Sequence, residues 1–262
     1  MNRPFRASPR PFACLFLLLL LAGCAAPVRE SGPDQPEAVS IQGPSRFSAA
    51  KDGGDLPPGW RVWSLSRFKR RTEYQLVHQD GRTVVRAKAD ASASGLVHDL
   101  NLDANRFPVI RWRWKVQELI PSADTTKRHA EDSPVRLVLT FEGDKNRFDF
   151  SDKMFATQLR LMTGVDLPYA TLMYIWENRA PVGTLLPNLH TARIKMIVAE
   201  SGKDRLGQWR EETRNIVEDF RRAFGEEPGR LVSVAVLTDT DNTEEQAHAY
   251  YGDIQFLPAP RR

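Results

Sequence analysis

The chain has 262 residues, with 37 lysines and arginines against 33 aspartates and glutamates, which gives a formal net charge of +4. Three of the basic residues and none of the acidic ones lie in the first 23 residues, so the remaining 262 − 23 = 239 residues carry a net charge of 34 − 33 = +1. This near-neutral charge argues against nucleic acid as a partner. The two cysteines, Cys14 and Cys24, exclude a disulfide framework or a cysteine metal site if the leader is removed, because only Cys24 remains.

The amino terminus predicts export. Three arginines precede an apolar run over residues 13–22, which is too short to cross a bilayer as a helix. The letters LAGC at residues 21–24 resemble the bacterial lipoprotein box, which implies cleavage before Cys24 and lipid attachment to it. The alternative is an ordinary secretory peptide cut after a small residue. The residue directly after the cysteine is Ala25 and not aspartate. By the sorting pattern of Gram-negative lipoproteins, this implies the outer membrane.

The segment after Cys24 predicts a tether. Residues 25–45 are rich in proline, serine, glycine, alanine and glutamate and hold few large apolar side chains. We expect the lipidated cysteine and a flexible tether over residues 24–45. After the tether we expect a single folded domain over residues 46–258 and then a short tail over residues 259–262.

The folded part predicts mostly strands. Short runs of alternating apolar and polar residues are separated by turn signals such as QDGR and DASASG. The predicted strands lie near residues 60–65, 72–78, 82–89, 94–101, 108–117, 134–142, 170–177, 191–199, 230–238 and 248–257.

Two segments predict helices instead. Over residues 149–162, Phe155, Leu159 and Met162 recur at helical spacing, and Gly164 follows. Residues 208–224 carry one apolar stripe and end before Gly225, which is typical of a helix C-cap. We expect both helices to cover the core of a sheet.

Many short, mostly antiparallel strands with two inserted helices predict a mainly β protein, an antiparallel β-sandwich of the jelly-roll kind. The two terminal strands, LVSVAVLTDTDN and AHAYYGDIQFLP, resemble the closing strands of galactose-binding-like carbohydrate-binding modules.

Four motifs occurring in order sharpen this resemblance. FPVIRWRWKV, EDSPVRLVLTFEG, TLMYIWEN and LTDTDNTEEQAHAYYGDIQF together resemble the bacterial domain-of-unknown-function family 3047 (DUF3047), over nearly everything after Phe47. The resemblance implies an exported bacterial domain without an assigned activity, and it leaves the chemistry open.

Three predicted strands place cations on one face and apolar residues on the other, because side chains alternate along a strand. If these strands are neighbours in one sheet, their cations form a basic surface for an anionic ligand, such as an acidic glycan, a lipopolysaccharide phosphate or a peptidoglycan fragment. The alternative is a solvated face whose cations pair with acids such as Glu131 and Asp132. The candidate ligand-binding residues are Arg111, Arg113, Lys115, Arg136, Arg193 and Lys195.

Tryptophans alternate with the cations in the first of these strands. Trp112 and Trp114 therefore belong to its apolar face and are expected in the core, with a sugar-stacking platform as the alternative.

Glycoside hydrolysis needs two carboxyl groups across a cleft. Glu142 and Glu177 each end a predicted strand and are the candidate catalytic residues, although no glucanase-type motif surrounds them. The alternative is that both are solvated turn residues.

An acidic segment near the end of the chain could bind a metal. Asp239, Asp241 and Asn242 offer the oxygen ligands that calcium prefers. Two alternatives remain: Asx turns between two antiparallel strands, or pairing of the carboxylates with the arginine face.

The leading hypothesis is an outer-membrane-anchored lipoprotein whose domain recognises an anionic or glycan ligand of the envelope without catalysis. A glycan hydrolase using Glu142 and Glu177 is one alternative. An assembly partner of other envelope proteins is another.

Overall fold

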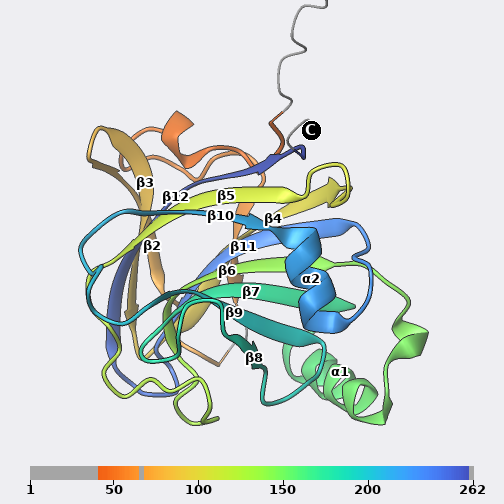
Figure 1. Cartoon of the computed structure of the whole chain (residues 1–262). Helices are drawn as coiled ribbons and strands as arrows, with labels where there is room; N and C mark the ends of the chain where they lie inside the picture. The colour runs from red at the N-terminus through yellow and green to blue at the C-terminus, as the bar shows by residue number, and fades with distance from the viewer. Residues whose placement is uncertain (1–40, 65–67, 260–262) are drawn as a thin grey trace, which may run out of the picture. The chain divides into compact units, whose positions relative to one another are not determined.

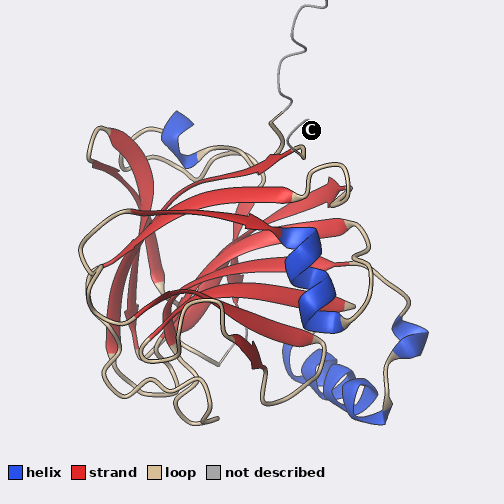
Figure 2. Ribbon diagram, in the orientation of Figure 1, coloured by secondary structure: helices blue, strands red, loops and turns tan. Residues whose placement is uncertain are grey.

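The computed structural model describes residues 41–64 and 68–259, and these form two β-sheets with two α-helices (Figures 1 and 2). The mainly β, jelly-roll sandwich predicted from the sequence is confirmed. The seven-stranded sheet has the order β1 (Trp60–Ser64), β4 (Ala93–Leu102), β11 (Leu231–Asp239), β6 (Ser133–Phe141), β7 (Ala170–Glu177), β9 (Ile194–Ser201), β8 (Leu185–Pro187). The five-stranded sheet has the order β10 (Arg210–Asn215), β5 (Val109–Val116), β12 (Gln246–Leu257), β3 (Arg82–Asp90), β2 (Glu73–Gln79). Neighbouring strands are antiparallel except β7 and β9, which are parallel.

The core lies between the two sheets because each sheet turns one apolar face inward. Trp112 and Trp114 of β5 are almost completely buried, as expected, and the Trp112 ring stacks on Tyr174 of β7 at 4.9 Å between centroids. Burying a ring of this size removes about 150–250 Å² of surface from water. The sugar-stacking alternative for these two tryptophans is therefore wrong.

The first helix is confirmed as α1 (Phe150–Thr163), with Asp149 as N-cap and Gly164 as C-cap. Its attachment combines apolar packing of Phe155 and Leu159 on the main core with polar contacts. Asp152 accepts a hydrogen bond from Thr191 at 2.7 Å and from Arg193 Nε at 2.8 Å. Figures 1 and 2 show α1 at the lower edge of the domain, beside a short 3-10 helix (Lys145–Arg147).

The second predicted helix is only half correct. Residues 210–215 form strand β10, which pairs with β5, and α2 (Ile216–Phe224) begins afterwards. Asn215 separates the two, because its side chain accepts from the backbone N–H groups of Val217 and Glu218 and caps the helix. The Phe220 side chain then packs on Phe141 at 4.8 Å between centroids.

Two further details differ from the expectations. Gln42 already pairs with Phe256 of β12, so ordered pairing begins inside the segment expected to be tether. A second 3-10 helix (Phe47–Ala49) follows and buries Phe47.

Strand β9 also differs from the expectation. Met196 and Val198 join a small cluster with Ile175, and Ile197 lies in the main core, so neither face of this strand is polar.

Within the described residues, no helix has the length and apolar character needed to cross a membrane. The predicted leader and Cys24 lie outside the described residues.

Candidate functional site

The structure separates the six candidate ligand-binding cations, because alternation along a strand gives a face but not a sheet. Arg111, Arg113 and Lys115 belong to β5 of the five-stranded sheet, while Arg136 and Lys195 belong to strands of the other sheet and Arg193 immediately precedes β9. The expectation of one shared basic surface is wrong.

Two of these arginines are held in internal ion pairs. Arg136 is buried, donates from Nε to Asp239 at 3.0 Å, and donates from Nη2 to the Glu131 carbonyl at 2.7 Å. Arg193 pairs with Asp152 and lies over the rings of Phe148 and Tyr169. These contacts are structural, and they leave neither guanidinium on an open face.

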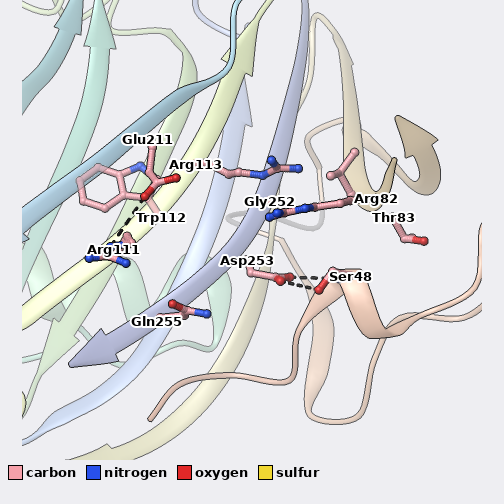
Figure 3. Close-up of a pocket in the computed structure, with 11 residues that line it drawn as sticks. Ser48, Arg82, Thr83, Arg111, Trp112, Arg113, Glu211, Gly252, Asp253 and Gln255 are labelled. Carbon is pink, nitrogen blue, oxygen red and sulfur yellow. Dashed lines mark hydrogen bonds and ion pairs between the residues drawn. The ribbon is translucent and has the colours of Figure 1, made fainter. Parts of the chain in front are cut away.

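The outer face of the five-stranded sheet carries a small open pocket of about 80 Å³, which we call the arginine pocket (Figure 3). It lies where β5, β12 and β3 meet the 3-10 helix at Phe47–Ala49 and where β10 contributes Glu211. Its polar lining includes Ser48, Arg82, Arg111, Arg113, Asp253 and Gln255.

Positive charge is crowded in the arginine pocket. Figure 3 shows the guanidinium groups of Arg82 and Arg113 close together beside Gly252. Partial burial, and then the charge of Arg82, lower the pKa of Arg113 below its ordinary value. Arg113 Nη2 is buried and has no hydrogen-bond partner within the described part of the chain. A buried donor without an acceptor costs about 1–3 kcal/mol, so an anion that reached it through a shift of the arginine side chain would recover that loss.

The carboxylates nearest the pocket do not neutralise it. Asp253 is engaged by Ser48, whose backbone N–H donates at 3.0 Å and whose hydroxyl donates as well. Glu211 approaches Arg111 at 3.8 Å, and both side chains are largely exposed. Three guanidinium groups thus face two carboxylates, which leaves an excess of one positive charge.

The local sequence YYGD shapes the pocket. The register of β12 against β5 shifts between Tyr251 and Ile254, which places Gly252 and Asp253 at a bulge. A Cβ atom at Gly252 would lie 2.4 Å from Arg113 Cγ, so glycine is required for the arginine to cross β12.

An aromatic patch adjoins the arginine pocket, formed by Trp209 and Tyr250 at 6.4 Å between ring centroids. Arg113 lies over the Trp209 ring at 4.3 Å, and Lys115 lies near both rings. Asp80 accepts from Trp209 Nε1 at 2.8 Å; this hydrogen bond, together with Lys115 nearby, lowers the pKa of Asp80. Lys115 is consequently buried and paired, and is not an open contact for a ligand.

The predicted metal residues lie in a second polar region, the acid cluster, defined by Asp132, Asp239 and Asp241. One carboxylate oxygen from each lies within 4.8 Å of the others. Residues 240–245, which include Asp241 and Asn242, connect the end of β11 in one sheet to the start of β12 in the other.

The structure compensates the acid cluster from within the protein. Arg136 pairs with Asp239, and Lys69 pairs with Asp241. Asp132 accepts from the Asn242 side-chain and backbone N–H groups and from the Thr243 backbone and hydroxyl. Pairing with an arginine is therefore the alternative that the structure shows for Asp239. Asn242 contributes a donor to Asp132, and calcium binding stays a prediction.

Burial still affects the acid cluster. Burial of Asp239 raises the pKa of its carboxyl to about 6; Arg136 lowers it, while Asp132 and Asp241 add to the rise.

The candidate catalytic glutamates lie at opposite ends of the seven-stranded sheet. Strands β6 and β7 are antiparallel with Phe141 opposite Ala170, so Glu142 lies next to one end of β7 and Glu177 ends the other. The seven steps from Ala170 to Glu177 span about 23 Å, whereas paired catalytic carboxyls lie roughly 5–9.5 Å apart. Glu177 is also buried and accepts from the backbone N–H groups of Arg179 and Ala180. These two residues cannot act as a catalytic pair.

Sequence reasoning missed Arg82, Ser48 and Trp209. Arg82 follows the turn signal QDGR, and Ser48 precedes the first strand, so neither stands in a motif. Trp209 was included in the apolar stripe of the predicted helix. No local pattern joins residues 48, 82, 113, 209 and 253, which the two-sheet topology brings together.

A family model described as "Protein of unknown function (DUF3047)" matches residues 58–255, about three quarters of the chain. The chain belongs to the DUF3047 family. This confirms the resemblance noted in the sequence, and the matched region of this DUF3047 protein contains Arg82, Arg113, Gly252 and Asp253. A search among curated proteins finds no match.

Several solved structures resemble this DUF3047 protein at low sequence identity. The family 11 carbohydrate-binding module of a cellulosomal cellulase from Clostridium thermocellum is 10% identical with a TM-score of 0.43, over 86% of this chain and 99% of that one. The xyloglucanase domain of NopAA, a type three effector from Sinorhizobium fredii, is 8% identical with a TM-score of 0.42, over 80% and 99%. Binding modules and hydrolases both occur in this group, so these similarities do not decide between binding and catalysis.

Proposed function

We propose that the sandwich is a recognition domain that binds an anionic glycan or envelope polymer at the arginine pocket, without catalysing a reaction. One observation carries the proposal. Arg113 lies close to the like charge of Arg82, and its buried Nη2 atom has no acceptor within the described part of the chain. Three guanidinium groups against two carboxylates leave an excess of positive charge, and this excess favours an anion between them.

The chemistry of the pocket suits a carboxylate or a phosphate group. Guanidinium groups bind both in a bidentate manner, and such charge-assisted hydrogen bonds are short and strong. The pocket is small, with a volume of about 80 Å³, which suits a single anionic group. The rest of the ligand would lie across the sheet, along Arg111, Gln255 and the partly exposed Trp209.

The test is a binding screen of residues 41–262 against lipopolysaccharide, peptidoglycan fragments and acidic polysaccharides. Arg113→Ala is the informative variant. Arg61→Ala is the matched control, because Arg61 is an exposed arginine of the other sheet that pairs with Asp99. We expect Arg113→Ala to weaken binding at least about tenfold and the control to leave it unchanged, since a hydrogen bond to a charged group contributes roughly 1.5–3 kcal/mol.

Two outcomes would contradict the proposal: no anionic polymer binds, or both variants bind as the wild type does. Capture of an envelope protein that is insensitive to Arg113→Ala would instead favour the assembly-partner alternative.

The proposal also includes a location, supported by the sequence of the leader. The domain is exported and held at the outer membrane through lipid on Cys24. Fractionation of a Gram-negative host that produces the full chain tests this. In that fractionation the protein should be found in the outer membrane, and labelled palmitate should be incorporated by the wild type and not by Cys24→Ser; a wild type without label would count against a lipid anchor.

A further inference from the structure

Helix α1 exposes large apolar side chains to solvent. Phe150 is 78% exposed, Met154 is 59% exposed and Leu161 is 82% exposed. Met162 and Val165 at its carboxyl end are also exposed. Single exposed apolar residues are ordinary, whereas several on one short helix mark an interaction surface.

The exposed residues form a stripe on the helix face opposite the domain. Phe150, Met154 and Leu161 are separated by four and seven residues, a spacing that puts them on one side of a helix with 3.6 residues per turn. Phe155 and Leu159 pack against the main core on the other side. We call Phe150, Met154 and Leu161 the outer stripe.

Cations border the outer stripe. At 100° per residue, Lys153 and Arg160 fall side by side next to the stripe and away from the side that carries Met162. Both side chains are exposed, and Arg160 lies 3.6 Å from the equally exposed Asp166. An apolar stripe with a basic border is the arrangement of a helix that lies in a membrane interface.

We propose that α1 docks this domain on an anionic lipid surface, with the outer stripe entering the headgroup boundary and with Lys153 and Arg160 meeting lipid phosphates. The Asp152–Arg193 pair and the Thr191 hydroxyl fix α1 to the sheet, so docking would also orient the domain. This proposal uses a surface separate from the arginine pocket, and either can fail without the other.

Two observations favour a lipid surface over a second copy of the chain. The three side chains of the outer stripe, at about 100 Å² each, present roughly 300 Å² of apolar surface, well below the roughly 800 Å² per partner of a stable protein interface. Moreover, Ile41 lies 41 − 24 = 17 residues after Cys24. A segment of that length reaches at most about 58 Å. A domain of some 220 residues has a diameter of roughly 45 Å. A lipid anchor at Cys24 therefore allows α1 to reach the same membrane.

Co-sedimentation with vesicles tests this proposal without the anchor. Residues 39–262 form one compact unit that contains every described strand and the core, so this part is suitable for the experiment. The probes are vesicles of phosphatidylcholine alone and of phosphatidylcholine with phosphatidylglycerol. We expect binding to the anionic vesicles that decreases with added salt.

The informative variant is Met154→Ser with Leu161→Ser, which should weaken vesicle binding by roughly tenfold or more because two apolar groups no longer enter the interface. The matched control is Val62→Ser with Val182→Ser, since these valines are 49% and 57% exposed on other elements. Thermal unfolding of both variants should match the wild type, because all four side chains are exposed.

A third variant, Lys153→Glu with Arg160→Glu, should reduce binding to anionic vesicles and leave that to neutral vesicles unchanged. Equal vesicle binding by the wild type and the Met154→Ser, Leu161→Ser variant would overturn the proposal, as would no binding at all. If the wild type forms dimers without vesicles and the Met154→Ser, Leu161→Ser variant does not, the outer stripe binds a second copy of the chain instead.

Discussion

The acid cluster and the arginine pocket both depend on the segment from Asp239 to Asp253, yet the protein treats their charges differently. In the acid cluster three carboxylates meet Arg136, Lys69 and a set of N–H and hydroxyl donors. In the arginine pocket Arg113 keeps a buried donor without an acceptor beside a second guanidinium. Charges that are satisfied internally stabilise the fold, whereas charges left unsatisfied on a concave surface are available to a ligand.

Breaking the acid cluster should have the largest effect. Arg136→Met leaves the Asp239 carboxylate buried without its cation, and removal of one partner from a buried pair costs about 3–5 kcal/mol. Urea unfolding measures this loss. Arg61→Met is the control, because its exposed pair with Asp99 should be worth about 0–1 kcal/mol.

Adding Asp239→Leu to Arg136→Met should restore part of the lost free energy of unfolding, since the Asp239 carboxylate is then no longer buried without its cation. A loss below about 1 kcal/mol for Arg136→Met alone would mean that the acid cluster is not held by this pair.

A substitution at Gly252 should affect ligand binding more than stability. In Gly252→Ala, the new Cβ would occupy the space of the Arg113 stem, so the guanidinium must leave its position. We expect affinity for an anionic ligand to fall by roughly tenfold, or about 1.4 kcal/mol, in isothermal titration calorimetry. The free energy of unfolding should change by less than that, and the reverse ranking would show that Gly252 serves the fold alone.

Glu212 is a half-buried carboxyl at the edge of the five-stranded sheet. Its carboxyl lies on β10 near Glu200; burial, and then the charge of Glu200, raise its pKa to about 7. Because the folded pKa exceeds the unfolded value, this group adds stability that is fully present at acid pH and is lost as pH rises toward 7. Glu212→Gln should remove that part of the pH dependence in urea unfolding between pH 4.5 and 7. If the free energy of unfolding of Glu212→Gln depends on pH as that of the wild type does, another group titrates in this range. Asp239, whose pKa is also raised, would be the next residue to substitute.

Chelation should have the smallest effect. Because Arg136 and Lys69 already compensate the acid cluster, we expect the same melting temperature with excess calcium and with a chelator. A ligand at 100 times its Kd stabilises a fold by about 2.7 kcal/mol, so a rise of several degrees with calcium would show that the cluster binds the ion.

Alternation predicted strands such as β5 well, because β5 turns one apolar face toward the core. The alternation in residues 108–117 placed Trp112 and Trp114 in the core, as found. It could not tell that β5 belongs to a different sheet from β6 and β9, since a period of two carries no information on strand order. Arg136 therefore resembled Arg113 in the sequence, although one is buried against Asp239 and the other lines a pocket.

Residues 208–224 show the other limit of sequence reasoning. The apolar stripe from Trp209 to Phe224 fits a helix, but β5 needs an edge partner, and Arg210–Asn215 supplies it. Tertiary pairing overrides local helix propensity here. As a consequence Trp209 lies beside Arg113 on the outer face of the sheet, where sequence analysis had not placed it.

The central claim is that Arg113 recognises an anionic group on a glycan. Isothermal titration calorimetry with two oligosaccharides of equal length, one of uronic acids and one of the corresponding neutral sugars, tests it most directly. We expect the acidic oligosaccharide to bind at least about tenfold more tightly to the wild type and Arg113→Ala to abolish this preference. Equal affinity for the two oligosaccharides, or a preference that persists in Arg113→Ala, would contradict the account.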